Sequence, residues 1–130
     1  MPFSIDQFEQ ELRGNILPFW AQHTLDHENG GFYGALTNDR QICNQVERSA
    51  VLYGRILWTF STAAFLYKDI TYQSIADRAF DYICSHFWDE QYHGIFWSLD
   101  QHGQPVNDRK HTYAQAFSIY GLSAYNEATA

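Results

Sequence analysis

Basic residues are scarce in this sequence of 130 residues. It holds 8 lysines and arginines against 15 aspartates and glutamates, which gives a formal net charge of −7. A surplus of negative charge repels a phosphate backbone, and no basic stripe is present to bind one. The composition therefore argues against nucleic acid as a partner.

Cysteine is scarce as well, and long apolar runs are absent. Cys43 and Cys84 lie far apart and outside any C-x-x-C spacing, which suits a reduced protein better than a disulfide-bonded secreted one. The first ten residues contain Asp6 and Glu9 and lack a cationic start followed by an apolar run, so they do not form a secretory signal. No stretch approaches the roughly 20 apolar residues of a membrane span. We expect a cytoplasmic protein with no membrane partner.

Aromatic residues, by contrast, are abundant. The chain contains 9 tyrosines, 10 phenylalanines and 4 tryptophans, and 45% of its residues are hydrophobic. This is enough apolar material for the core of one domain. Aromatic rings supply large buried areas and also faces on which sugars can stack, and composition alone does not decide between these uses.

Two segments of the sequence repeat each other. Leu25-Asp26-x4-Gly31-Phe32-Tyr33 is echoed 63 positions later by Trp88-Asp89-x4-Gly94-Ile95-Phe96. The pattern predicts an amphipathic helix before each copy, then a short hairpin and a more apolar helix after it. The chain is therefore expected to be one domain portion, residues 1–130, built from units of about 1–67 and 68–130.

Local signals give the expected bounds of these elements. Ser4 and Gln7 form a candidate capping box for the first helix, in which Pro18 should cause a kink or begin a new turn. Thr71 is the candidate N-cap of the equivalent helix in the second unit. The expected hairpins are Phe32 to Ile42 and Ile95 to Val106. The expected apolar helices are Val46 to Tyr67 and Arg109 to Ala128.

A unit of this kind cannot bury its apolar surface alone, so neighbouring units must stack or close into a ring. Two units leave an open edge, whereas six copies would come to roughly 380 residues. The sequence stops at Ala130 as the second unit finishes, without a C-cap glycine. We therefore expect an all-α repeat fold that has been truncated.

Four segments carry recognisable motifs. They are Gly-Gly-Phe-Tyr-Gly at 30–34, Arg-Ile-Leu-Trp-Thr-Phe-Ser at 55–61, Ala-Asp-Arg-Ala-Phe-Asp-Tyr at 76–82, and Tyr-Ala-Gln-Ala-Phe-Ser-Ile-Tyr-Gly-Leu-Ser at 113–123. In order and spacing they resemble the N-terminal third of the cellobiose 2-epimerases, within the N-acylglucosamine 2-epimerase superfamily. The resemblance implies two helical hairpins of an incomplete (α/α)6 barrel, with short β-hairpins in the connecting loops around a sugar pocket.

The resemblance also implies an isomerase that inverts C2 of a reducing sugar, either a cellobiose-type disaccharide or an N-acylglucosamine. In this family the C2 proton of the opened sugar is removed and returned to the other face through an enediolate. Histidines act as acid and base, and no metal or other cofactor is needed. Those histidines lie on later helices and have no counterpart among the six present here. We therefore assign no catalytic residue to this chain and expect it to be inactive alone.

Two family residues carry over by motif. Arg55 opens Arg-Ile-Leu-Trp-Thr-Phe and Tyr113 opens Tyr-Ala-Gln-Ala-Phe, and in the family both line the substrate pocket. The residues alone give Arg55 some support, because a guanidinium on a mostly apolar helix face needs a carboxylate or a ligand oxygen if it is buried. The alternatives are a structural ion pair and a side chain whose charged end reaches water. They give Tyr113 none, because a stripe formed with Phe117 and Tyr120 is more often core packing.

Two other side-chain patterns are better explained by local structure than by metal binding or catalysis. His23 and His27 have zinc-ligand spacing, but the glutamate of a metalloprotease motif is missing and a helix C-terminus favours histidine, so we assign no metal. Asp26 and Asp89 could resemble the carboxylate pair of a glycosidase. Because they recur at equivalent repeat positions, turn chemistry explains them better.

Two further functions fit the same sequence. The barrel class could carry a glycoside hydrolase or lyase, since fold does not fix chemistry. A helical repeat could also bind a partner protein through its open edge without catalysis. Paired acids on later helices would indicate hydrolysis and paired histidines epimerisation. The sequence leaves the exact sugar and the oligomeric state open.

Overall fold

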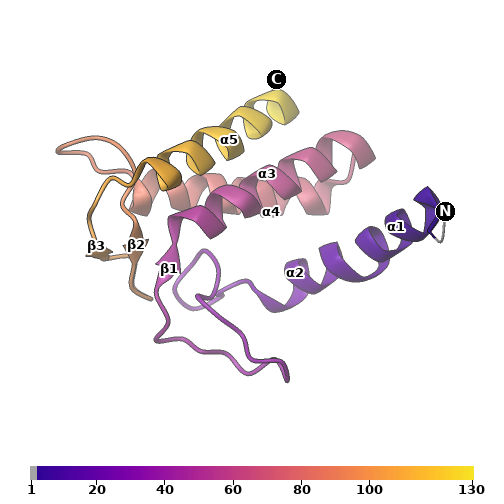
Figure 1. Ribbon diagram of the computed structural model, residues 1–130, viewed down its shortest axis with the longest axis horizontal. Coiled ribbons are helices and arrows are strands. Elements are labelled where there is room, and N and C mark those ends of the chain that lie inside the picture. The colour runs from indigo at the N-terminus through magenta and orange to yellow at the C-terminus, as the bar shows by residue number, and fades with distance from the viewer. Residues whose placement is uncertain (1–2) are drawn as a thin grey trace.

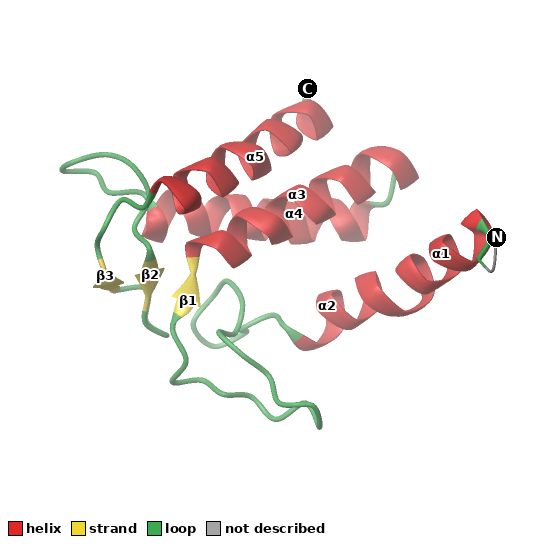
Figure 2. Cartoon of the chain, in the orientation of Figure 1, coloured by secondary structure: helices red, strands yellow, loops and turns green. Residues whose placement is uncertain are grey.

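The computed structural model describes residues 3–130 and is mostly helical (Figures 1 and 2). The helical elements are α1 (Ile5–Glu11), the π-helix η1 (Leu12–Ile16), α2 (Leu17–His23), α3 (Ala50–Tyr67), α4 (Ile70–Tyr82), the π-helix η2 (Ile83–Phe87) and α5 (Thr112–Thr129). Because α1, η1 and α2 are continuous, as are α4 and η2, the described chain has the four principal helices that the repeat predicted. None of its helices is long and apolar enough to cross a bilayer.

Capping and proline chemistry explain the outer helices. The N–H of Ser4 donates to the Gln7 side chain at 2.8 Å and the N–H of Gln7 to the Ser4 hydroxyl at 3.3 Å, so the capping box is confirmed. Pro18 lies in the first turn of α2, directly after η1, where it cannot donate a backbone hydrogen bond. The second N-cap prediction is wrong. Asp69 caps α4, and its carboxylate accepts from the N–H of Thr71 at 2.8 Å.

A small antiparallel sheet joins the two units. Its strands β1 (Arg48–Ser49), β2 (Ser98–Leu99) and β3 (Pro105–Asn107) lie in that order. β2 and β3 form the second predicted hairpin, whereas the pairing of β1 with β2 was not predicted. The first hairpin is shorter than predicted. Leu36 and Ile42 form a single bridge, and the chain then turns away through a hydrogen bond from Val46 N–H to the Cys43 carbonyl.

Both apolar helices begin later than their patterns predicted. α3 begins at Ala50 rather than Val46, because Arg48 and Ser49 pair with β2 before the helix starts. α5 begins at Thr112 rather than Arg109, after β3 has paired with β2. Apolar periodicity contains no information about these tertiary pairings. The helices predicted from it therefore included residues that lie in or next to the sheet.

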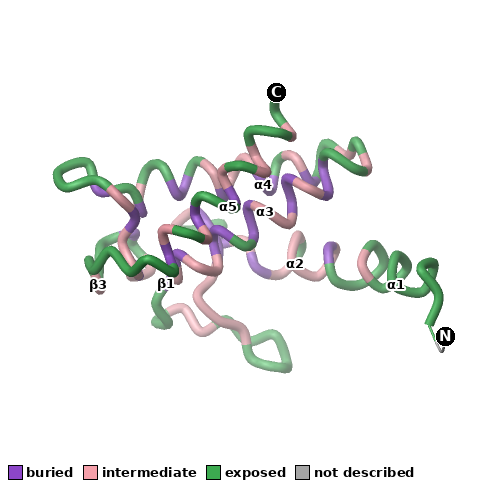
Figure 3. The backbone as a smooth tube through the Cα atoms, turned by 45° about the horizontal axis from the view of Figure 1, so that its top comes forward, coloured by how far each residue is buried: buried purple, intermediate pink, exposed green. Residues whose placement is uncertain are grey.

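α3 is the central helix and packs against α4 and α5 (Figures 1 and 3). The most buried side chains include Tyr53, Leu57 and Phe60 of α3 together with Ala76 and Ala79 of α4. Along α5, burial is confined to Ala114, Ser118 and Gly121, which follow one another at helical spacing. α5 therefore buries a narrow stripe and leaves its larger side chains beside that stripe.

Two glycines bring the backbones of α3 and α5 into direct contact. A Cβ atom built on Gly54 would lie 2.5 Å from the carbonyl oxygen of Phe117, and one on Gly121 would lie 2.5 Å from the carbonyl oxygen of Gly54. Neither position can accept a side chain without movement of the facing backbone. The contact therefore fixes how the two helices lie against each other.

We predict that Gly121→Ala destabilises the chain by about 1–3 kcal/mol, the usual effect of overpacking a close contact. The measurement is the free energy of unfolding in urea. Gly14→Ala is the matched control, because Gly14 is also helical but has nothing within 4 Å of an added Cβ. Alanine there should be neutral or should stabilise by about 0.5–1 kcal/mol. Equal losses at both positions would contradict the close contact.

Candidate functional site

A hollow of about 570 Å³ lies between α3 and α5. Its lining comes from the two helices in equal parts: Arg55, Trp58 and Thr59 from α3, and Ala116, Phe117 and Tyr120 from α5. Separations of three and four residues place the members of each set on one helix face. The lining of this α3–α5 hollow is thus largely aromatic and carries a single positive charge.

The guanidinium of Arg55 has no carboxylate partner among the described residues. Its Cζ atom instead lies 5.2 Å from the ring centroid of Phe117. A cation beside an aromatic face is stabilised by the quadrupole of the ring, and its N–H donors remain available to other acceptors. Within residues 3–130, therefore, the structural ion pair considered for Arg55 is not formed. Arg55 is exposed in this chain, which agrees with the alternative that its charged end reaches water.

Aromatic rings run continuously along the hollow. Trp58 of α3 and Tyr120 of α5 stack with centroids 5.0 Å apart and planes 9° apart. Phe117 meets Tyr120 edge-on at 6.1 Å and Tyr113 edge-on at 5.0 Å. Because edge-to-face and stacked pairs restrain one another, the rings form a defined surface.

Tyr113 adjoins the α3–α5 hollow but is not one of its six lining residues. Its exposure is 58% and that of Tyr120 is 45%, so the interpretation of this aromatic stripe as core packing is wrong. The reason is that α5 contacts α3 through its small residues, which leaves the aromatic stripe beside the contact. Arg55 and Tyr113 are brought together around one ring, that of Phe117.

Sequence reasoning missed five of the six lining residues, namely Trp58, Thr59, Ala116, Phe117 and Tyr120. Helical spacing from Arg55 could have found the first two, and spacing from Tyr113 the others. The histidines do not contribute: within the described chain none of the six lines the hollow. His23 packs against Phe19, with ring centroids 5.2 Å apart, and no metal-binding cluster of three or more suitable side chains occurs in residues 3–130.

The loop before each apolar helix is organised by an aspartate. The Oδ1 atom of Asp26 accepts from the N–H groups two and three residues later at 3.0 and 2.9 Å. Asp89 makes the same two bonds at 3.0 and 3.1 Å. The prediction of turn chemistry at both positions is confirmed.

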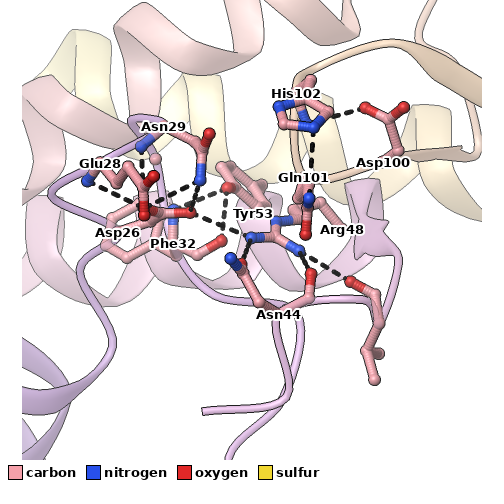
Figure 4. A network of polar contacts seen from close by, with 12 residues as sticks. Asp26, Glu28, Asn29, Phe32, Asn44, Arg48, Tyr53, Asp100, Gln101 and His102 are labelled. Atoms are coloured by element: carbon pink, nitrogen blue, oxygen red, sulfur yellow. Dashed lines mark hydrogen bonds and ion pairs between the residues drawn. The ribbon is translucent and has the colours of Figure 1, made fainter.

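Asp26 also binds a buried arginine that the sequence analysis missed (Figure 4). Nη2 of Arg48 lies 3.0 Å from Oδ2 of Asp26, and both side chains are 1% exposed. The other Arg48 donors bond to Asn44 and to the carbonyl of Val46. In the second unit, Nζ of Lys110 lies 2.7 Å from Oδ2 of Asp89. Arg48 and Lys110 are 62 positions apart, and this recurrence of a basic residue was the sequence signal that could have predicted both ion pairs.

The first turn of α3 binds the loop that holds Asp26, and the first turn of α5 binds the loop that holds Asp89 in an equivalent way. The Tyr53 hydroxyl accepts from the N–H of Phe32 at 2.7 Å and donates to its carbonyl at 3.0 Å. Gln115, 62 positions later, binds the N–H and carbonyl of Ile95 at 2.8 and 2.7 Å. Burial raises the pKa of Tyr53, so its hydroxyl stays protonated and can donate. Each helix that lines the hollow is therefore anchored to its own loop.

The part of the chain that contains α3 and α5 is also similar to known proteins. Residues 30–130 match the family model of N-acylglucosamine 2-epimerase (GlcNAc 2-epimerase), and they include both helices that line the α3–α5 hollow. The chain belongs to the N-acylglucosamine 2-epimerase family.

Cellobiose 2-epimerases are among its relatives. The protein from Bacteroides fragilis is 41% identical over 123 residues, which are 95% of this chain and 31% of the relative. The protein from Eubacterium cellulosolvens is 43% identical over 120 residues, which are 92% of this chain and 29% of the relative. A crystal structure of a sugar epimerase from a ruminal bacterium matches with a TM-score of 0.91 and 37% identity over 96% of this chain and 32% of that one.

The chain thus spans about a third of the length of these relatives. The match confirms the predicted fold class, a mostly helical portion of an (α/α)-barrel epimerase with a small antiparallel sheet in its loops.

We predict that Asp26→Asn destabilises this family member by about 3–5 kcal/mol at neutral pH, because Arg48 is then buried without an opposite charge. Urea unfolding measures the effect. Asp108→Asn is the matched control, because Asp108 is exposed and its carboxylate makes no ion pair among the described residues. A loss at Asp26 no larger than that at Asp108 would contradict the account.

The same pair predicts a pH dependence. Burial alone would raise the pKa of Asp26, but hydrogen bonds from Asn29, Arg48 and Glu28 outweigh it and lower the pKa below the ordinary value. A carboxyl whose pKa is lowered by folding adds stability above its unfolded pKa of about 3.9, and this is lost as the pH falls below that value. Between pH 7 and pH 3 the wild type should therefore lose more stability than Asp26→Asn. Parallel pH profiles would refute the assignment.

Proposed function

We propose that this chain supplies two helical hairpins of a sugar 2-epimerase barrel, and that the α3–α5 hollow forms part of its sugar pocket. One observation carries the proposal: the Arg55 guanidinium, free of any carboxylate in the described chain, borders an aromatic hollow in a protein related to cellobiose 2-epimerases. The substrate would be a reducing sugar, either a cellobiose-type disaccharide or an N-acylglucosamine.

In this proposal Arg55 donates hydrogen bonds to oxygen atoms at the reducing end of the sugar. A base removes the C2 proton of the open-chain aldehyde. The C2–H electron pair forms a C1=C2 double bond, and the π pair of the C1 carbonyl moves onto O1 to give an enediolate. Return of a proton to the opposite face of C2 completes the inversion. Because negative charge develops on oxygen during proton removal, a fixed guanidinium stabilises the transition state more than the ground state.

The other lining residues have supporting roles in the proposal. The stacked rings of Trp58 and Tyr120 offer apolar faces to the C–H groups of the sugar. Tyr113, next to Phe117, bonds a sugar hydroxyl. None of the described histidines lines the hollow, so the proton transfers are assigned to histidines on further helices of a complete barrel. Imidazole suits both roles because it titrates near neutrality.

A fusion tests the proposal. We predict that this chain, joined to the remaining two-thirds of the Bacteroides fragilis cellobiose 2-epimerase, epimerises cellobiose in D2O with incorporation of deuterium at C2. The 130-residue chain alone should show no turnover on cellobiose, lactose or N-acetylglucosamine, because it lacks a positioned acid–base pair. Proton NMR follows the C2 signal, and the intact Bacteroides enzyme is the positive control.

Turnover by the isolated chain would contradict the proposed division of roles, and so would a folded fusion that leaves C2 unlabelled.

Arg55→Ala in the active fusion should lower kcat by about 10²–10³-fold, the typical loss when one donor to a developing oxyanion is removed. KM should change much less, since the bond is strongest in the transition state. Tyr113→Phe should have a smaller effect. Arg109→Ala, an exposed arginine outside the hollow, is the matched control. An unchanged kcat in Arg55→Ala would refute the proposed role of Arg55.

A further inference from the structure

Phe117 adjoins three of the aromatic and charged side chains at the α3–α5 hollow. Its ring centroid lies 5.2 Å from Cζ of Arg55, 5.0 Å from the ring of Tyr113 and 6.1 Å from the ring of Tyr120. Arg55 comes from α3, whereas the two tyrosines share α5 with Phe117. Phe117 is therefore the contact through which α5 reaches the charged residue of α3.

The backbone fixes where this contact occurs. A Cβ on Gly54 would lie 2.5 Å from the carbonyl oxygen of Phe117, so these two residues are held against each other. Arg55 follows Gly54 directly. The guanidinium and the ring that supports it are thus attached to opposite sides of the same backbone contact, which limits how far one can move relative to the other.

The other restrained arginines of the described chain are held differently. Arg48 has a carboxylate and two backbone carbonyls as partners, and Arg78 donates to the backbone carbonyls of Asp26 and Gly31. Arg13 lies over Tyr67 but also faces Glu9 at 3.7 Å. Arg55 has the aromatic contact without an ion pair. A ring restrains a guanidinium without occupying its N–H donors, which suits a side chain that must bind a ligand.

We propose that Phe117 is a positioning residue, which holds the Arg55 guanidinium by its aromatic face so that the donors of Arg55 point at the sugar. The inference rests on the proposed function. Without the ring, Arg55 samples more rotamers. Part of the free energy of its contact with the sugar must then offset the entropy lost when the guanidinium is oriented. Phe117 itself touches no reacting atom in this scheme.

The test is a double-mutant cycle in the active fusion. Phe117→Leu should lower kcat for cellobiose by about 10-fold or more, since small misplacements of a catalytic contact have large effects, with less than a threefold change in KM. Phe117→Tyr should restore the activity, because it keeps the aromatic face. In the Arg55→Ala background, Phe117→Leu should change kcat by less than twofold, because no guanidinium remains to be positioned.

Equal effects of Phe117→Leu in both backgrounds would overturn the inference, because a merely structural role acts whether or not Arg55 is present. Fluorinated phenylalanines at position 117 provide a second measurement that preserves shape and therefore folding. As the negative charge of the ring face decreases, kcat should fall stepwise, and a flat series would also overturn the inference.

These experiments distinguish a failure of the proposed function of Arg55 from a failure of the positioning role of Phe117. If Arg55→Ala retains full kcat, the proposed function of Arg55 fails and the positioning role of Phe117 fails with it. If Arg55→Ala is impaired while Phe117→Leu matches the unsubstituted fusion, only the positioning role fails.

Discussion

The backbone contact between α3 and α5 determines what the rest of the molecule can present. Gly54 faces the carbonyl of Phe117, and Gly121 faces the carbonyl of Gly54, with no room for a Cβ at either glycine. Larger side chains are therefore displaced to the side of the contact, where those of both helices meet. The α3–α5 hollow and its aromatic lining follow from this arrangement, and so does the position of Arg55 beside Phe117.

The loops that precede the two helices hold this arrangement in place with the same geometry but different chemistry. A buried arginine pairs with the turn aspartate in the first unit, and a lysine whose side chain is 30% exposed does so in the second. A tyrosine hydroxyl binds the backbone of Phe32 where a glutamine amide binds that of Ile95. What the repeat preserves is the set of backbone groups that are bound, so the similarity is clearer in the structure than in residue identities.

Much of the fold could be predicted because its signals are local. The Ser4 capping box, the turn aspartates and the helical periodicity each depend on residues a few positions apart. Most of the errors have tertiary causes. The exception is the N-cap of α4, where Asp69 lies only two positions before the predicted Thr71. The start of α3, the buried partner of Asp26 and the exposure of the aromatic stripe depend on segments distant in the sequence. An aromatic stripe has the same period whether it faces a core or a hollow, so Tyr113 was singled out by family resemblance, and Phe117 only by the structure.

The contact between Arg55 and Phe117 is the most direct point at which to test this account. Nuclear Overhauser spectroscopy of the labelled 130-residue chain should give cross-peaks between the Arg55 δ-protons and the Phe117 ring, with the arginine signals shifted upfield by the ring. Cross-peaks between Gly54 and Gly121 serve as the reference for the helix contact. If the glycine cross-peaks are present while the Arg55 δ-protons resonate at their random-coil position without contact to Phe117, then the helix contact does not place the guanidinium on the ring, and the account is contradicted.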